Sequence, residues 1–143
     1  MREKGKKRYV TGQQLGLLGG PLYTTYKVLG ALHYAEKNRG EAVYWLETND
    51  ADFNEINQIH YIDSDKNLRS LKWEIDSKGY SCGSILVDKK LVSILNEFFN
   101  TIIVTEHTAE LKDMALDCYV PGRTLGEASA CLAAKLFEDF DLE

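Results

Sequence analysis

The chain has 143 residues, of which 44% are hydrophobic and 27% are charged, and its net charge is -5. This composition is typical of one globular domain and excludes a disordered or low-complexity chain, and the negative charge makes a nucleic-acid backbone an unfavourable partner. No apolar run reaches the roughly 18 residues of a membrane span and no signal-peptide core follows the start, so we predict no membrane partner and a cytoplasmic protein.

The N-terminus is the one strongly basic part of the chain. Its first eight residues, MREKGKKR, contain five basic residues and one acidic residue. A basic arm can steer an anionic ligand, but a solvated chain end is the more common case. We therefore expect residues 1–8 to be a flexible start to a single domain that spans residues 1–143.

The three cysteines give little sign of a metal site or a disulfide framework. Cys82, Cys118 and Cys131 are odd in number and show no CxxC spacing. We expect all three to be reduced thiols and predict no metal site.

The first half of the chain predicts a strand, a helix and a second strand. Residues 8–12 are β-prone, a helix can begin at Pro21 and continue to about residue 38, and residues 41–47 follow. Apolar residues alternate onto both faces of 41–47, as in an interior parallel strand. About forty residues therefore predict a βαβ unit with a right-handed crossover.

A β-hairpin is predicted next. The runs QIHYID and LRSLKWEI flank the turn-rich sequence DSDKN. We expect residues 58–76 to be a small hairpin insertion at the edge of the sheet.

The second half predicts further strands and helices. Residues 84–87 and 101–105 are strand-like, and Asp88 can cap a helix that continues to about residue 100. A second helix is expected over residues 108–118. The apolar stripe expected on the first of these helices is Leu91, Ile94, Leu95 and Phe98.

The last predicted helix begins with a capping box. Thr124 is followed three residues later by Glu127, and an apolar stripe follows. Its members are Leu125, Ala128, Leu132 and Leu136. The pattern then calls for another strand, so we predict an α/β fold whose Rossmann-like parallel sheet, with flanking helices, is incomplete. A companion chain or self-association through the open sheet edge is expected to complete it.

The sequence VTGQQLGLLGGPLYTTYK, residues 10–27, is the first candidate site. It falls at the carboxyl end of the first strand, where doubly wound folds bind ligands, but it matches neither GxGxxG nor a P-loop. Tyr23 and Lys27 share one helix face, with Thr24 nearby, and together they could hold an anion. The alternative is that the glycines only shape a loop, Tyr23 packs and Lys27 extends along the surface.

The acidic sequence NDADFNEIN after the second strand is the second candidate. Asp50, Asp52 and Glu55 could hold an amine, a ribose or a metal through its waters. They could equally cap a helix and favour its first turn. Both candidates lie at the carboxyl ends of neighbouring strands, which strengthens each of them.

Other polar residues are weaker candidates. His33, His60 and His107 lie at no recognisable metal spacing, so core or surface positions are the more common explanation. Arg123, in YVPGRT, could place its positively charged side chain in the site or simply belong to a helix-entry turn.

Three blocks together, VTGQQLGLLGGPLYTTYK, YWLETNDADFNEIN and YVPGRTLGEA, resemble the BshC family, which is assigned to cysteine addition in bacillithiol synthesis. The resemblance spans nearly the whole chain but only part of the longer family members. It implies a Rossmann-type core like that of class I aminoacyl-tRNA synthetases. It also implies a ligase that joins the carboxyl group of L-cysteine to the amine of glucosaminyl malate, with ATP or ADP as a nucleotide to consider.

The resemblance also implies a site. It assigns substrate or nucleotide binding to Gln13, Gln14, Gly20, Pro21, Tyr23, Thr24, Lys27 and Phe53, and catalysis to Asp50, Asp52 and Glu55. The second block departs from the family pattern, because Asn49 and Ala51 stand where Glu and His are usual. Two functions therefore stay open: a core segment of the ligase that is active with the remainder of the enzyme, or a non-catalytic remnant that binds a small molecule or nucleotide.

Overall fold

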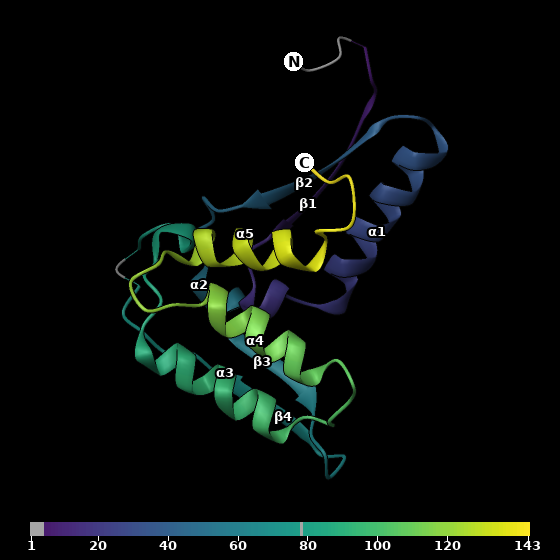
Figure 1. Ribbon diagram of the computed structural model, residues 1–143. Coiled ribbons are helices and arrows are strands. Elements are labelled where there is room, and N and C mark those ends of the chain that lie inside the picture. Colours follow the sequence, from purple (N-terminus) through teal and green to yellow (C-terminus); the bar gives the residue numbers. More distant parts are fainter. Residues whose placement is uncertain (1–4, 78) are drawn as a thin grey trace.

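The computed structural model describes residues 5–77 and 79–143 (Figure 1). The first four residues of the expected flexible start lie outside this range. Arg8 is not part of a flexible start, because it begins the first strand and forms ion pairs with Glu41 and Glu143, at 3.4 and 2.6 Å. Within the described ranges, no helix is long and apolar enough to cross a membrane.

The predicted βαβ unit is confirmed. It consists of β1 (Arg8–Gln14), the short 3-10 helix η1 (Leu17–Gly19), α1 (Leu22–Lys37) and β2 (Glu41–Glu47). The two strands pair in parallel, so that Gln14 lies opposite Glu47 at their carboxyl ends. Pro21 is the N-cap of α1 rather than its first residue, and its fixed φ suits this entry into the helix.

One face of the β1–β2 pair is covered by two helices. Tyr44 of β2, Val28 of α1 and Ser129 of α5 (Leu125–Leu136) line the same small cavity, so both helices lie on this face. The opposite face is open in the described chain, where Val10 is 62% and Trp45 60% exposed.

The outer edge of β2 pairs with the last residues of the chain. Tyr44 N–H donates to the Glu143 carbonyl at 2.7 Å, and Glu143 N–H donates to the Ala42 carbonyl at 3.0 Å. Leu142 forms a parallel bridge with Ala42. The last residues therefore run parallel to β2 along its outer edge, at the place where a strand is expected after the last helix.

The predicted hairpin is also confirmed, as β3 (Gln58–Ile62) and β4 (Leu68–Lys72), and α2 (Phe53–Ile56) precedes it. Its expected place at the sheet edge is not seen in the described residues. The hairpin forms a sheet separate from β1 and β2 and lies against α3 (Lys89–Thr101), where the hydroxyls of Tyr61 and Thr101 are 2.6 Å apart.

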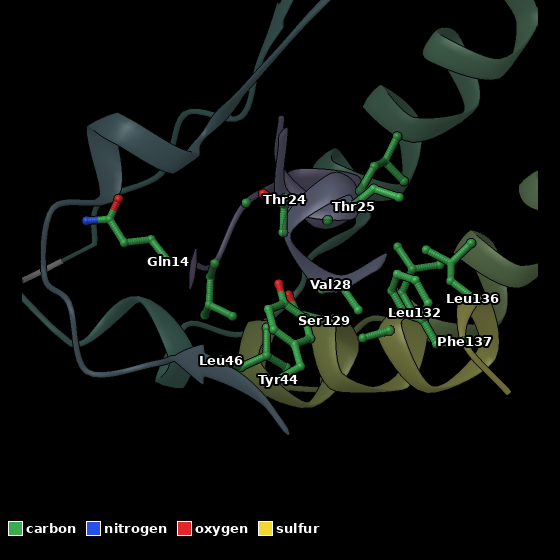
Figure 2. Close-up of a pocket in the computed structure, with 15 residues that line it drawn as sticks. Gln14, Thr24, Thr25, Val28, Tyr44, Leu46, Ser129, Leu132, Leu136 and Phe137 are labelled. Carbon is green, nitrogen blue, oxygen red and sulfur yellow. The ribbon is translucent and has the colours of Figure 1, made fainter. Parts of the chain in front are cut away.

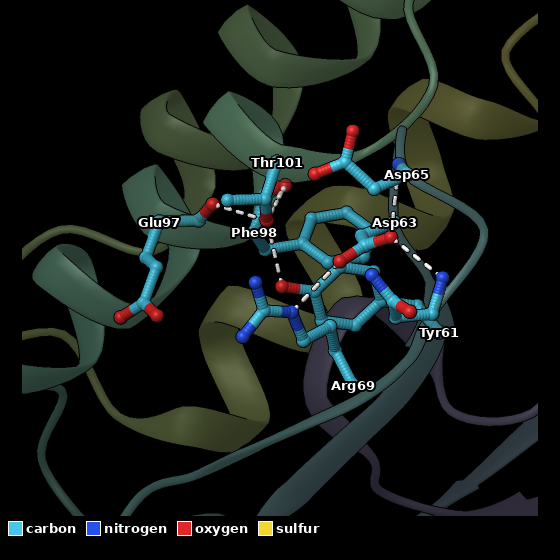
Figure 3. Close-up of polar contacts among 8 residues, drawn as sticks. Tyr61, Asp63, Asp65, Arg69, Glu97, Phe98 and Thr101 are labelled. Carbon is cyan, nitrogen blue, oxygen red and sulfur yellow. Dashed lines mark hydrogen bonds and ion pairs between the residues drawn. The ribbon is translucent and has the colours of Figure 1, made fainter.

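The hairpin turn is organised around a buried carboxylate (Figure 3). Asp63, only 2% exposed, accepts the backbone N–H groups of Asp65 and Asn67 and pairs with Arg69 Nε at 2.8 Å. These donors hold the pKa of Asp63 below its ordinary value, the Arg69 hydrogen bond being the largest cause.

The strands predicted at residues 84–87 and 101–105 are wrong. Ile85 and Val87 are buried but pair with the turn before α5, as Val87 N–H donates to the Arg123 carbonyl at 2.9 Å. The 3-10 helix η2 (Cys82–Ser84) precedes them. Thr101 ends α3, and Val104 is 79% exposed. Both runs have strand-like composition, but no neighbouring strand completes a ladder.

Helices α3 and α4 (Thr108–Cys118) pack beside each other, and α5 runs between α4 and the parallel strands (Figure 1). Asp88 caps α3 by accepting Leu91 N–H at 2.8 Å, as predicted. The capping box of α5 is likewise confirmed. The apolar stripe differs at two positions, because Phe99 rather than Phe98 is buried on α3 and Leu136 is 38% exposed on α5.

The expectation of three reduced thiols is wrong for one pair. Cys118 and Cys131 form a disulfide between α4 and α5, with their Cα atoms 5.5 Å apart, and Cys82 is free and buried. The sequence separation of 13 residues shows no motif. Only the antiparallel packing of the two helices brings the sulfur atoms together.

Candidate functional site

A cavity of about 410 Å³ lies at the carboxyl end of β1. Its walls come from the end of β1, the glycine loop that follows (residues 15–21), α2 and β3. Five of the predicted site residues line it: Gln13, Gln14, Gly20, Pro21 and Glu55. This is the position at which parallel α/β sheets bind ligands.

Gln14 connects the two sequence clusters. Its Nε2 atom donates a hydrogen bond to Asp50 Oδ2 and a second one to Glu55 Oε2 at 3.3 Å. Because β1 and β2 are parallel, the glutamine and the acidic segment reach the same end of the sheet. These hydrogen bonds join the two candidate clusters, which the sequence places at the carboxyl ends of neighbouring strands.

The local hydrogen bonds keep Asp50 ionised. The pKa of Asp50 is lowered first by the backbone N–H of Asp52, whose nitrogen is 3.0 Å from Oδ1, and then by the Gln14 amide. The pKa of the neighbouring Cys82 shifts in the opposite direction. Burial, together with the charges of Asp50 and Asp52, raises the pKa of its thiol, so Cys82 is protonated near neutral pH.

Two of the predicted residues have structural partners instead of a place in the cavity lining. Asp52 is the N-cap of α2 and accepts Asn54 N–H at 3.2 Å, which is the capping alternative raised by the sequence. Phe53 is 5% exposed and packs edge to face on Trp73, with ring centroids 5.2 Å apart. Through these contacts, both residues hold the acidic segment in place.

Tyr23 and Lys27 lie together but outside the cavity lining. Lys27 Nζ is 5.6 Å from the Tyr23 ring centroid, and it donates to the Gly12 carbonyl and to Gln13 Oε1 at 3.1 Å. Tyr23 is 67% exposed. The ammonium therefore fixes α1 to β1, and it orients Gln13, which does line the cavity.

The glycines allow a compact loop. A Cβ atom on Gly16 would lie only 2.6 Å from Gly20 Cα, and Gly20 has a φ of 77°. Leu18 N–H in this loop donates to the Tyr119 hydroxyl at 3.1 Å. Burial raises the pKa of Tyr119, which keeps this acceptor neutral. The loop is thus held against the helical core, and its residues line one side of the large cavity.

A second, smaller cavity of about 40 Å³ lies behind the glycine loop (Figure 2). Thr24 and Val28 of α1 face Tyr44 of β2 and Ser129 and Leu132 of α5 across it. Thr24, predicted to bind ligand, belongs to this cavity rather than to the large one. Burial raises the pKa of Tyr44.

The sequence missed several lining residues. His60 and Gln58 of β3 line the large cavity, and Ser129 of α5 lines the small one together with residues of β1, α1 and β2 that lie far from it in the chain. The hairpin follows the acidic segment directly, and this adjacency is the signal that could have placed His60 there. Arg123 donates to the Cys118 carbonyl at 3.0 Å and belongs to the turn between α4 and α5.

Metal binding has no visible basis in the described ranges. No group of three His, Cys, Asp or Glu side chains in residues 5–77 and 79–143 is placed to hold an ion. The polar lining of the large cavity consists of amides, one carboxylate and one imidazole, which suits hydrogen bonding to an organic ligand.

The comparisons with known proteins concern the chain as a whole. The family model described as "Bacillithiol biosynthesis BshC, N-terminal Rossmann-like domain" matches residues 1–142. A relative from Solibacter usitatus is 34% identical over 99% of this chain and 28% of its own length. One from Salinibacter ruber is 28% identical over 97% of the chain and 27% of its own length. Both relatives carry the name "Putative cysteine ligase BshC".

These relatives are much longer than the chain. A third one, from Chlorobaculum tepidum, is 31% identical over 93% of the chain but only 25% of its own length. The chain thus spans about a quarter of the length of the curated relatives it matches. It belongs to the BshC family of bacillithiol biosynthesis and corresponds to that family's N-terminal Rossmann-like domain.

Proposed function

We propose that the 410 Å³ cavity is the substrate site of a cysteine ligase, and that this chain supplies the part of the enzyme that holds the small molecules. The proposed reaction forms an amide C–N bond between the carboxyl carbon of L-cysteine and the amine of glucosaminyl malate. The carboxyl C–O bond breaks, its oxygen leaves with a phosphoryl or nucleotidyl group taken from ATP, and the amine gives up a proton. The observation that carries the proposal is the Gln14 bridge, which brings both motif clusters to the mouth of one cavity in a BshC domain.

The residues in and around the cavity are assigned separate roles in the proposed reaction. Glu55 is the carboxylate of the cavity lining, and it is placed to hold an ammonium group or to accept a proton from the attacking amine. Asp50 shares the Gln14 amide with it and adds negative charge nearby. Asp52 supports both by capping α2. In this proposal Asp50, Asp52 and Glu55 form the catalytic group.

The binding group is proposed to include the amides and the loop. Gln13 and Gln14 offer side-chain donors and acceptors, and Gly20 and Pro21 let the backbone approach a ligand. Tyr23, Thr24, Lys27 and Phe53 are assigned supporting positions around it. ATP and ADP are the nucleotides to test, and a cytoplasmic location for the ligase stays a prediction.

Isothermal titration calorimetry tests the proposal. The chain is titrated separately with L-cysteine, glucosaminyl malate, ATP and ADP, and the titrations are repeated with Glu55→Gln. Saturable binding of cysteine or glucosaminyl malate is expected. Glu55→Gln is expected to weaken it roughly tenfold or more, because a charge-assisted hydrogen bond to an ammonium is lost.

The matched control is Glu97→Gln on the exposed side of α3, which should leave binding unchanged. If the folded chain bound none of these compounds, the substrate-site proposal would be rejected. Equal binding by Glu55→Gln and the parent chain would remove Glu55 from the site.

The second candidate function is a non-catalytic binding module. It is favoured by Ala51, which stands where the family resemblance calls for an imidazole, and by the hydrogen bonds that already occupy Asp50. The two functions differ when the chain is combined with the remaining three quarters of a family member. Amide formation in that mixture supports the ligase, whereas binding without product supports the module.

A further inference from the structure

We propose that the 40 Å³ cavity behind the glycine loop is the side-chain pocket that selects cysteine. This inference rests on the proposed function of the large cavity, because the backbone atoms of the amino acid would lie there. It adds the residues that decide which amino acid is accepted, namely Thr24, Val28 and Ser129.

The two cavities lie next to each other and share part of their lining. Gln14, Leu15 and Gly16 line both of them. In this proposal the ammonium and carboxylate of the amino acid lie beside Gln14 and Glu55 in the large cavity, and its side chain enters the small cavity at the shared residues Gln14 to Gly16. The rest of the lining of the small cavity comes mainly from α1, β2 and α5 (Figure 2).

The size of the small cavity limits what can enter. A space of about 40 Å³ accommodates about three water-sized atoms, since each needs roughly 10–15 Å³. The CH₂–SH group of cysteine has two heavy atoms and fits this limit. The side chain of methionine has four and exceeds it.

The polarity of the small cavity also suits a thiol. Val28, Leu46 and Leu132 give it apolar walls. Thr24 is 4% and Ser129 6% exposed; the Thr24 hydroxyl oxygen lacks a hydrogen-bond partner among the described residues, and the Ser129 hydroxyl faces the buried Tyr119 hydroxyl. Buried hydroxyls normally have a partner. A thiol is a weak donor and a weak acceptor, so it can partner the Thr24 hydroxyl while its sulfur contacts the apolar walls.

Two sets of calorimetric titrations test the pocket. In the first, the parent chain is titrated with L-cysteine, L-2-aminobutyrate, glycine and L-methionine. Cysteine is expected to bind more tightly than 2-aminobutyrate, and methionine roughly tenfold or more weakly than cysteine, which is the discrimination typical of a pocket that is too small.

In the second set, Ser129→Leu fills the pocket from α5. It is expected to weaken cysteine binding roughly tenfold while leaving glycine binding unchanged, because glycine places nothing in the pocket. The control, Ser93→Leu, makes the same exchange on the exposed side of α3. Thr24→Val keeps the volume of the threonine, and it should remove the preference for cysteine over 2-aminobutyrate.

The outcomes separate the two proposals. If glycine and cysteine bind equally well to the parent chain and to Ser129→Leu, the side-chain pocket is rejected and the amino-acid site stands. Binding of methionine as tight as that of cysteine rejects the pocket without any variant. If the folded parent chain binds no amino acid, both the pocket and the site that it depends on are rejected.

Discussion

At the scale of single residues, Asp63 shows how one buried charge organises a turn. Its carboxylate accepts hydrogen bonds from Asp65 and Asn67 of the β3–β4 connection and from Arg69 of β4, whose side chain is more than half exposed. Because the charge is buried with its donors in place, removal of the charge leaves Arg69 without its partner and the backbone donors with a weaker acceptor.

We expect Asp63→Asn to destabilise the fold, and we expect the loss to depend on pH. The folded-state pKa of Asp63 is lowered, so its contribution is present above the unfolded value of about 3.9 and disappears as pH falls through the lower folded value. Urea unfolding at pH 7 and at pH 3 measures this. The control is Asp65→Asn on the same turn, where the side chain is exposed. A loss that is equal at both pH values would contradict the assignment.

At the scale of elements, the disulfide joins the two helices that border the glycine loop. Cys118 ends α4, and Tyr119 follows it with a hydroxyl that accepts Leu18 N–H from the loop. Cys131 lies on α5, which carries Ser129. The disulfide therefore fixes α5, which forms part of the lining of the small cavity, relative to the end of α4 that contacts the glycine loop.

We expect reduction of the disulfide, or Cys131→Ser, to lower the free energy of unfolding by about 3 kcal/mol. This is the chain-entropy value for a loop of roughly this length. Chemical denaturation with and without a dithiol reductant measures the change. Cys82→Ala serves as the comparison, because its effect should be the same in both buffers. Alkylation of both Cys118 and Cys131 in the folded, unreduced protein would contradict the link.

At the scale of the whole molecule, the parallel pair is covered on one face only. Val10 and Trp45 lie on this open face, one pairing position of the same face apart along the ladder, and both are mostly exposed. Parallel sheets are normally covered on both faces. The described chain thus presents an apolar sheet surface that a longer family member has the additional chain length to cover.

We expect the isolated chain to self-associate through this surface as its concentration rises. Trp45→Lys should shift the equilibrium toward monomer, because it places a charge in the centre of the apolar face. Light scattering coupled to size exclusion measures the mass. Val104→Lys, which changes a still more exposed apolar residue in the loop before α4, should have no effect. A monomer at all concentrations would contradict the prediction.

The sequence by itself determined the local structure and the place of the first site cluster. The βαβ unit, the hairpin and the caps at Asp88 and Thr124 depend on short-range periodicity and on side chains a few residues apart, so they are readable from the chain. The family also follows from three blocks whose order and spacing are sequence properties.

Only the tertiary structure decided which residues face the cavities. Lys27 could point to a ligand or to β1, and Asp52 could bind or cap, since each choice is equally compatible with its sequence neighbours. The disulfide and the position of Ser129 depend on the packing of α5 against α4 and α1. Such contacts join residues far apart in the chain, and their geometry is fixed by how whole helices and strands pack rather than by any local pattern.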